Sequence, residues 1–358
     1  MQVQKLNEVL ATAVRHGGSD IHIKVGAAVH VRLNGALQSL GTPPVTPQDA
    51  RAVCVHLVAD PRVRDAIDQI KEYDCSYSLP GVGRFRVNIY RQRGCHTAIL
   101  RIIPTKVPTL AQLGLPPAVG ELANTERGIV LVTGATGTGK STTLAAMIGQ
   151  INATRKCHIV TIEDPIEYVH QDLMASVSQR EIGTDTSTFS IALRAALRQD
   201  PDVLLVGEMR DSEAIDIALK ASETGHVVYS TVHTTDAAKT IGRLVSVFPT
   251  EQHESVRYRL SDNLAATVSQ RLLPRADGRG RVVAMEIMRV TKTVREFIRN
   301  KDRTIEIKDA IERDAGQTGM QSFDQHLRDL YRKGLITIET AKSAASTPSD
   351  FERALYVQ

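Results

Sequence analysis

The sequence predicts an α/β protein in which a small mixed α+β domain precedes a larger domain built on a parallel sheet. Its 358 residues are enough for about two domains at roughly 150 residues each. Strands of alternating polarity occupy the N-terminal part, whereas uniformly apolar strands separated by helical segments follow a proline-rich stretch. Alternation is typical of strands with one solvated face, and continuous apolar runs are typical of parallel strands covered on both faces.

Composition narrows the class of protein further. Hydrophobic residues make up 42% and charged residues 23% of the chain, which is the balance of a folded globular protein. The apolar runs, such as residues 129–132, are far shorter than the ~18 residues that span a bilayer, and the N-terminus has no basic-then-apolar signal pattern. We therefore expect a cytoplasmic protein with no transmembrane segment.

Charge balance and aromatic content argue against a nucleic-acid partner. The net charge is +4, from 44 basic and 40 acidic residues that are interspersed along the chain. Only 4% of the residues are aromatic and Trp is absent, so few side chains are available to stack on single-stranded bases. We expect no direct binding of nucleic acid.

A helix and the start of a sheet are predicted near the N-terminus. Residues 5–15 place apolar side chains along one helical face, and the glycines at 17–18 end it. Residues 21–25 and 29–33 alternate between apolar and polar, as half-buried strands do. The Asn-Gly dipeptide at 34–35 is suited to the positive φ angles of a tight hairpin turn.

The rest of the first domain contains a second helix and further strands. Thr46 precedes Pro47, and this pair predicts a helix capped by the threonine that begins at the proline. Alternation at 85–89 completes a mixed α+β domain, which we assign to residues 1–103. The prolines within residues 104–118 predict a linker.

The second domain is predicted to contain a parallel sheet covered on both faces. We assign it to residues 119–290, and we expect residues 291–358 to form a charged, helical C-terminal segment. Helical segments separate the apolar runs from one another, which is the pattern of parallel strands joined by helical crossovers. The predicted strands are residues 129–133, 159–162, 203–206 and 227–231.

A glycine-rich phosphate-binding loop is the strongest functional signal in the chain. The segment GATGTGKS at residues 134–141 follows the first apolar strand and precedes a helical segment, which is the context that this motif requires. Its glycines allow backbone N–H groups to point at phosphate oxygens. Lys140 is expected to reach the terminal phosphates of ATP, and the Ser141 hydroxyl to coordinate Mg²⁺. The predicted nucleotide-binding residues of this segment are Gly134, Ala135, Thr136, Gly137, Thr138, Gly139, Lys140, Ser141 and Thr142.

Two glutamates are candidates for the acidic groups that a nucleoside triphosphatase needs. Glu208 follows the apolar run 203–206, where such enzymes hold the metal, although Gly207 replaces the usual Asp. Glu163 ends the run 159–162, and its spacing from Lys140 suits a neighbouring strand in a RecA-like sheet. We predict that Glu163 is the catalytic base and Glu208 a metal ligand, and the reverse assignment stays open.

Two histidines flank the predicted strand 227–231. His233 follows the strand beside Thr234, at the carboxyl end where ligands bind in open α/β sheets. We predict that His233 senses the γ-phosphate, and we include His226, which precedes the strand, among the nucleotide-binding residues. The alternative for each is an ordinary histidine at a strand end.

Together these motifs resemble those of the secretion ATPase superfamily that powers type IV pili and type II secretion. The resemblance covers nearly the whole chain and is strongest to the pilus-retraction branch, the PilT-like twitching motility ATPases. Besides the phosphate-binding loop, it rests on four segments. These are the N-terminal signature at 17–22 (GGSDIH), the acidic box at 161–168 (TIEDPIEY), the Walker B segment at 206–211 (VGEMRD) and the His box at 226–243.

The resemblance implies an architecture and partners. It implies a homohexamer in which each subunit pairs a PAS-like N-terminal domain with a RecA-like ATPase core, with ATP bound where neighbours meet. It also implies a location at the inner-membrane base of the pilus machine, with a pilus platform protein as partner. N-terminal arginines of that family reach nucleotide bound by the core, so Arg84 is our first candidate for a charge supplied across the interface, ahead of Arg86 and Arg93.

Two features favour retraction over assembly. Assembly and secretion ATPases typically carry an extra N-terminal domain and a four-cysteine metal site, and neither is expected here. Residues 293–300 (TVREFIRN) resemble the AIRNLIRE-type motif of retraction ATPases but depart from it at Glu296 and Asn300. A PilU-like accessory retraction ATPase and an assembly or type II secretion ATPase are therefore the alternatives.

Two further classes of protein are less favoured. A nucleic-acid translocase would need clustered basic and aromatic residues, which the composition does not supply. A nucleotide-dependent scaffold that does not hydrolyse ATP would not need Lys140, Glu163 and Glu208, which are all present.

Overall fold

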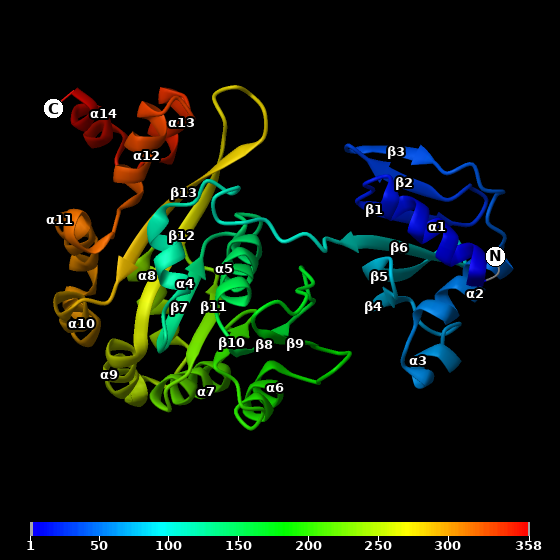
Figure 1. Ribbon diagram of the computed structural model, residues 1–358, viewed down its shortest axis with the longest axis horizontal. Coiled ribbons are helices and arrows are strands. Elements are labelled where there is room, and N and C mark those ends of the chain that lie inside the picture. The colour runs from blue at the N-terminus through cyan, green and yellow to red at the C-terminus, as the bar shows by residue number, and fades with distance from the viewer. Residues whose placement is uncertain (1–2, 357–358) are drawn as a thin grey trace. The chain divides into compact units, whose positions relative to one another are not determined.

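The computed structural model describes residues 3–356, which form two compact units (Figure 1). Of the described residues, the first unit comprises those up to Lys106 with two later segments, Asp164–Val169 and Glu181–Asp185, and the others form the second. In the described part of the chain, no helix combines the length and the apolar character needed to cross a membrane.

The first unit is built on an antiparallel sheet of six strands in the order β3-β2-β1-β6-β5-β4. Apolar side chains of the first two helices pack on this sheet, with Leu10 and Leu57 buried beside Ile21 and Phe85. The strands are β1 (Asp20–Lys24), β2 (His30–Leu33), β3 (Ala36–Ser39), β4 (Glu72–Leu79), β5 (Gly83–Gln92) and β6 (Cys95–Ile103). The helices are α1 (Val3–Arg15), α2 (Pro47–Leu57) and α3 (Pro61–Asp65).

Local turn and capping signals are confirmed in this unit. Asn34 and Gly35 have φ angles of 48° and 85° and connect β2 to β3. The Thr46 side chain accepts a hydrogen bond from the backbone N–H of Asp49, whose carboxylate accepts one from the N–H of Thr46. Strand β4 was not predicted, because none of its residues is fully buried and its apolar alternation is weak.

The second unit is built on a seven-stranded sheet in the order β13-β12-β7-β11-β10-β8-β9. The strands from β12 to β8 are mutually parallel, and β13 runs antiparallel to β12. The strands are β7 (Gly128–Thr133), β8 (His158–Glu163), β9 (Ser176–Glu181), β10 (Val203–Val206), β11 (Val227–Val232), β12 (Leu264–Pro274) and β13 (Arg281–Arg289).

Helices cover both faces of this sheet, as the apolar strands predicted. The first two, α4 and α5, pack on one face, whereas α7 and α8 contact the other. The described C-terminal region is helical from α10 onward. The helices are α4 (Pro117–Ala123), α5 (Lys140–Thr154), α6 (Phe189–Ala196), α7 (Ser212–Glu223), α8 (Ala237–Ser246), α9 (His253–Asn263), α10 (Lys292–Arg299), α11 (Ile307–Thr318), α12 (Phe323–Arg332), α13 (Ile338–Ala344) and α14 (Pro348–Tyr356), with 3₁₀ turns at Thr250–Gln252 and Lys301–Glu306.

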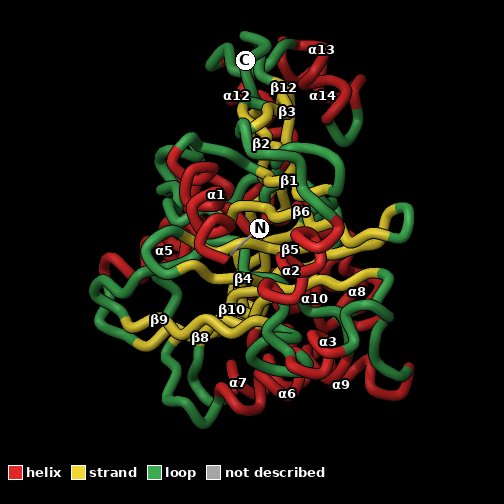
Figure 2. Tube along the Cα trace, turned by 90° about the vertical axis from the view of Figure 1, so that its right-hand side faces the viewer, coloured by secondary structure: helices red, strands yellow, loops and turns green. Residues whose placement is uncertain are grey.

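The order of the strands differs from the prediction in one respect. Strand β8, which ends at Glu163, is not adjacent to β7, because β11 and β10 lie between them. A helical crossover can return the chain to any position in a parallel sheet, so sequence spacing alone leaves the order open. Strand β9, which lies beside β8 (Figure 2), and the β12–β13 hairpin were also missed.

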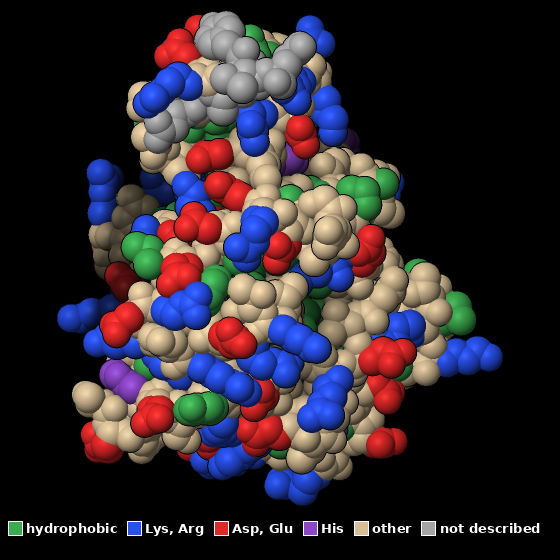
Figure 3. Space-filling model, turned by 90° about the vertical axis from the view of Figure 1, so that its left-hand side faces the viewer, with side chains coloured by type: hydrophobic (Ala, Val, Ile, Leu, Met, Phe, Trp, Pro, Cys, Tyr) green, Lys and Arg blue, Asp and Glu red, His purple; other side chains and the backbone are tan. Residues whose placement is uncertain are grey.

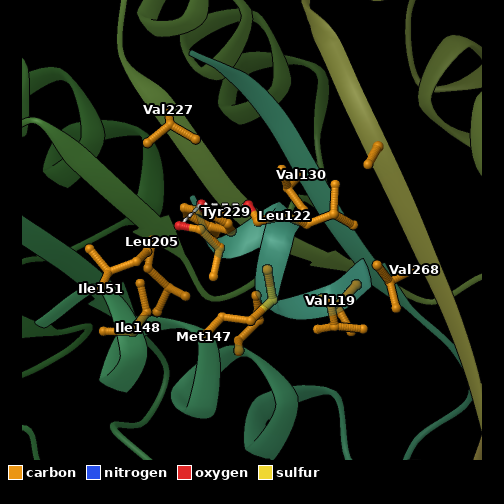
Figure 4. Packing of buried hydrophobic residues seen from close by; sticks show 14 of the residues in the cluster. Val119, Leu122, Val130, Met147, Ile148, Ile151, Leu205, Val227, Tyr229 and Val268 are labelled. Carbon is orange, nitrogen blue, oxygen red and sulfur yellow. Dashed lines mark hydrogen bonds between the residues drawn. The ribbon is translucent and has the colours of Figure 1, made fainter. Parts of the chain in front are cut away.

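One core of the second unit lies between the sheet and the helices α4 and α5 (Figure 4). Its largest fully buried side chain is Tyr229 on β11. The Tyr229 hydroxyl donates to the carbonyl oxygens of Leu122 and Ala123 at 3.0 and 3.1 Å. These carbonyls belong to the last turn of α4, where the helix ladder ends, and the Leu122 carbonyl also accepts from the backbone N–H of Thr125 at 3.2 Å. The phenol therefore ties the end of α4 to the middle of the sheet.

Replacing Tyr229 with Phe tests this link. The substitution keeps the ring but removes the hydroxyl donor from the Ala123 carbonyl and one of the donors from the Leu122 carbonyl, so the free energy of unfolding should fall by about 1–2 kcal/mol. Denaturant titration followed by circular dichroism measures it. The matched control is Tyr331→Phe, which removes a hydroxyl from a side chain that is 37% exposed, and it should leave stability unchanged. Equal stability of the two variants would contradict the assigned role.

Candidate nucleotide-binding site

The glycine loop and three of the other predicted site residues lie at one edge of the central sheet. The glycine loop follows β7, Glu163 ends β8, Glu208 follows β10 and His233 follows β11. Because these strands are parallel, their carboxyl ends lie at the same edge, which is where open α/β sheets bind ligands.

His226 is separated from this group. It precedes β11 and therefore lies at the amino end of the strand, about 20 Å along the chain direction from His233 at ~3.3 Å per residue. Its Nδ1 atom contacts the carbonyl oxygen of Ala221 at 2.9 Å and the Thr224 hydroxyl at 3.1 Å. The strand places the two histidines at opposite edges of the sheet, so His226 lies far from the glycine loop of its own chain, and its assignment as a nucleotide-binding residue stays a prediction.

The glycine loop has a backbone that other residues could not adopt. Gly134, Gly137 and Gly139 have φ angles of 149°, 79° and 90°. A Cβ atom on Gly134 would lie 2.6 Å from the carbonyl oxygen of Gln270 and from the Thr138 hydroxyl. The loop leads directly into α5, whose first N–H groups have no intrahelical partner. Such a loop at a helix N-terminus fits a phosphate group.

Lys140, the first residue of α5, turns back over the glycine loop. Its side chain is buried, and its Nζ atom lies 3.0 Å from the carbonyl oxygens of both Gly134 and Ala135. The same Nζ atom is 3.5 Å from Nδ1 of His233. Ser141 and Thr142 follow in the first turn of the helix. The lysine charge is thus held at the mouth of the loop.

His233 joins Lys140 to Glu208. The Nε2 atom of His233 lies 3.4 Å from Oε1 of Glu208, while its Nδ1 atom faces Lys140. A neutral imidazole accepts at one nitrogen and donates from the other, so an Nε2–H tautomer satisfies both neighbours. Glu208 also pairs with Arg210 at 2.8 Å. The preceding residue, Gly207, is held in place because its carbonyl accepts a hydrogen bond from the Thr231 hydroxyl at 2.7 Å.

Glu163 lies further along the same edge. Three inter-strand spacings separate β8 from β7, or about 14 Å at ~4.8 Å each. The Glu163 carboxylate accepts hydrogen bonds from the Thr161 hydroxyl at 2.6 Å and from the Gln179 amide at 3.1 Å. These two donors orient the carboxylate.

A residue that sequence reasoning missed braces the glycine loop. Gln270 on β12 is buried; its amide donates to the Thr138 carbonyl at 2.6 Å, and its amide oxygen accepts from the Thr143 hydroxyl at 3.0 Å. The neighbouring Ser269 accepts from the hydroxyl of Thr133, the last residue of β7, at 3.0 Å. The run of three polar residues at 269–271, between apolar residues on both sides in β12, was the available signal.

Arg84, the candidate for a charge supplied in trans, is engaged within its own unit. Its Nη2 atom lies 3.1 Å from Glu181, and its Nη1 donates to Ser78 at 3.2 Å. Burial favours a higher pKa for Glu181, but hydrogen bonds from Ser76 and from the backbone N–H of Ile166, together with the Arg84 charge, hold that pKa below its usual value. Glu181 therefore stays ionised and retains the arginine.

The segment at 293–300 that resembles a retraction motif forms most of α10. This helix buries Val294, Phe297 and Ile298. Its Arg299 pairs with Asp262 of α9 at 2.8 Å. These contacts make α10 an amphipathic helix docked on α9.

On the face of the molecule in Figure 3, Lys and Arg side chains lie among Asp and Glu side chains.

A parallel sheet with this glycine loop at its carboxyl edge defines a P-loop nucleotide-binding protein. Residues 2–342 match the family model described as "Type II/IV secretion system protein", and the chain belongs to this family. The family that the sequence motifs predicted is therefore confirmed.

Relatives of the chain include proteins of pilus retraction. It is 45% identical to "Type IV pilus retractation ATPase PilT" of Pseudomonas aeruginosa over 97% of this chain and 99% of that protein. It is 40% identical to "Type IV pilus ATPase PilU" of the same species, over 98% of this chain and 90% of that protein. Among solved structures, the pilus retraction motor PilT with bound ADP is similar with a TM-score of 0.87 and 44% identity, over 97% of this chain and 99% of that one.

Proposed function

We propose that this chain is an ATPase motor that powers retraction of type IV pili. The observation that carries the proposal is the 45% identity to the retraction ATPase PilT over almost the full length of both proteins. The grouping of Lys140, His233 and Glu208 beside the glycine loop supplies the local chemistry that such an enzyme needs. The reaction is the hydrolysis of ATP to ADP and phosphate.

The glycine loop and the start of α5 form the proposed phosphate site. Backbone N–H groups of the loop and of the first helical turn provide donors, and Lys140 balances the charge of the terminal phosphates. A side chain on Gly134 would fill this cradle. The proposed nucleotide-binding residues of the segment are Gly134, Ala135, Thr136, Gly137, Thr138, Gly139, Lys140, Ser141 and Thr142.

Mg²⁺ is the proposed metal. Within residues 3–356 no three His, Cys, Asp or Glu side chains cluster as metal ligands, so the ion would be held mainly by the nucleotide, with the Ser141 hydroxyl and the Glu208 carboxylate. Oxygen ligands of this kind suit Mg²⁺. When bound, the ion neutralises charge that develops on the phosphates.

Glu163 is the proposed general base and His233 the proposed sensor of the γ-phosphate. Thr161 and Gln179 donate to the Glu163 carboxylate and orient it, and in this proposal the carboxylate accepts a proton from water. His233 contacts both Lys140 and Glu208. A change in the contacts of the Lys140 ammonium group therefore reaches the Glu208 carboxylate through one imidazole ring.

Replacing Lys140 with Ala in the strain that encodes this chain tests the function. The purified variant should fold but lose ATP turnover, because the loop loses its balancing cation. Cells should keep extended pili that no longer retract, as measured by fluorescent-pilus microscopy. Lys333→Ala, at an exposed position, is the control and should leave both readouts unchanged. Loss of pilus extension instead of retraction would identify an assembly motor.

The two glutamates are distinguished by separate substitutions. Glu163→Gln should preserve binding of Mg-ATP while lowering turnover by about a hundredfold or more, because the amide cannot accept the proton. Glu208→Gln should in addition raise the Mg²⁺ concentration needed for half-maximal binding. Fluorescent-nucleotide titration at several Mg²⁺ concentrations separates the two effects. If the phenotypes are exchanged, the roles of the two carboxylates are reversed.

The assembly that we propose is a homohexamer that binds ATP between neighbouring subunits. Each subunit would contribute a PAS-like domain at residues 1–103, a linker at 104–118, a RecA-like core at 119–290 and a helical segment at 291–358. The ring would act on a pilus platform protein from the cytoplasmic side of the inner membrane. The mixed α/β fold and the similarity to PilT support this arrangement.

Arg84 is the proposed residue that completes the site of the neighbouring subunit. A positive charge supplied across an interface stabilises the charge of the transition state only after assembly. Mixing Arg84→Ala with Lys140→Ala subunits tests this role, because some interfaces of a mixed ring would combine an intact loop with an intact arginine. ATPase activity should partly return in mixed rings. Absence of recovery with verified co-assembly would assign Arg84 to its own chain.

An accessory retraction ATPase is the second candidate. The departures at Glu296 and Asn300 from the retraction motif and the 40% identity to PilU favour it. In that case retraction would persist at reduced force after the Lys140→Ala substitution, provided that a second retraction ATPase is present in the same cell.

A further inference from the structure

A buried carboxylate outside the predicted site contacts the helix that follows His233. Glu286 on β13 is only 5% exposed. One of its carboxylate oxygens accepts a hydrogen bond from the backbone N–H of Ala237 at 2.8 Å. Ala237 is the first residue of α8, so a strand of the sheet satisfies one of the N–H groups that a helix start leaves unpaired.

The start of α8 is the far end of the short loop that carries His233. Asp236 caps the helix through the N–H of Lys239 at 2.8 Å. The Thr240 hydroxyl contacts both the Thr234 hydroxyl and the Asp236 carbonyl at 2.7 Å. The loop from His233 to Asp236 is therefore held between the end of β11 and an anchored helix, and the place of that helix sets the place of the imidazole.

The β12–β13 pair also contacts the base of the glycine loop. Glu286 is opposite Ser269 in the register of the pair. Ser269 accepts a hydrogen bond from Thr133, the residue before Gly134, at 3.0 Å. Two paired residues of one hairpin thus contact both sides of the site: Ser269 bonds to the residue before the phosphate loop, and Glu286 to the start of the helix that follows the histidine loop.

We propose that Glu286 is a positioning residue of the nucleotide site, whose ionised carboxylate anchors α8 and so sets how His233 lies between Lys140 and Glu208. The inference rests on the proposed ATPase function. Glu286 touches none of the reacting groups and acts through the start of α8.

The charge of this anchor changes within the physiological pH range. The pKa of Glu286 is raised to about 7, mainly by burial and also by the negative charge of Asp236. The hydrogen bond from the Ala237 N–H and the charges of Arg271 and Lys308 act in the opposite direction. A carboxylate accepts a stronger hydrogen bond than a neutral carboxyl group. The hydrogen bond from the Ala237 N–H to Glu286 therefore strengthens as pH rises through about 7, while the burial of the new charge lowers the stability of the fold. The groups that face it are Asp236 of α8, Arg271 of β12 and Lys308 of α11, with His326 of α12 bonded to the N–H of the adjacent Met285.

The pH profile of ATP hydrolysis by the full chain tests the proposal. Glu286→Gln keeps an acceptor for Ala237 but carries no charge, so kcat should fall about threefold at pH 8 and match the wild type at pH 6. Glu286→Ala removes the acceptor, and kcat should fall about tenfold at pH 8 with KM for ATP changed less than twofold. The matched control is Thr291→Ala, which removes the cap of α10 and should leave the pH profile unchanged.

Thermal unfolding gives a readout that does not depend on catalysis. A folded-state pKa above the unfolded value means that protonation of Glu286 stabilises the fold at low pH, and that this stabilisation is lost as pH rises through about 7. The melting temperature of Glu286→Gln should therefore rise relative to the wild type between pH 5 and pH 8. The wild type should show the larger loss of stability over that interval.

Three outcomes would overturn the proposal. A wild-type activity limb near pH 7 that persists in Glu286→Gln would assign it to another group. The same loss of kcat in Thr291→Ala would mean that any weakened helix start has this effect. A melting difference independent of pH would contradict a buried, titrating carboxyl group. If the wild type itself does not hydrolyse ATP, the proposed function fails. If the wild type hydrolyses ATP and the Glu286 variants have the same kcat and pH profile as the wild type, only the positioning role of Glu286 is refuted.

Discussion

The nucleotide site depends on one close backbone approach, between Gly134 and the carbonyl of Gln270. A Cβ atom at position 134 would come within 2.6 Å of that oxygen, so only glycine lets β12 pair with β7 as far as the loop. This pairing brings the Gln270 side chain to the Thr138 carbonyl and to Thr143 of α5. The loop, the helix that follows it and the β12–β13 hairpin are thereby fixed as one body.

The central strands of the second unit place charged groups at the carboxyl edge of the sheet, beside the glycine loop. Parallel pairing puts the residues after β7, β10 and β11 side by side, and the imidazole of His233 occupies the space between an ammonium group and a carboxylate. Ordinary strand spacing thus produces a contact among three groups that are far apart in the sequence. Glu163, the proposed proton acceptor, follows a strand further along the sheet and is thereby separated from this charged cluster.

Much of this organisation was accessible from the sequence, for local physical reasons. Positive φ angles at Asn34 and Gly35 and the cap at Thr46 are determined by neighbouring residues, so residue type alone predicted them. Continuous apolar runs predicted strands of the parallel sheet, and in the structure these strands are buried throughout. The order of β8 in the sheet and the bracing by Gln270 depend on pairing between distant segments, which a single sequence does not encode in any local pattern. The sequence already placed His226 before β11 and His233 after it, and the structure puts the two histidines at opposite ends of that strand.

The position of the Lys140 ammonium group has a thermodynamic consequence. Its hydrogen bonds to the carbonyl oxygens of Gly134 and Ala135 are both 3.0 Å long. A phosphate that binds the ammonium group must replace these bonds. Binding is then an exchange of partners, in which the enthalpy gained is the difference between two sets of strong contacts. An anion with a single weak acceptor gains little from that exchange, whereas a polyphosphate that engages loop and lysine together gains more. The hydrogen bonds from Lys140 to its own loop thus set what an anion must offer in exchange for this cation.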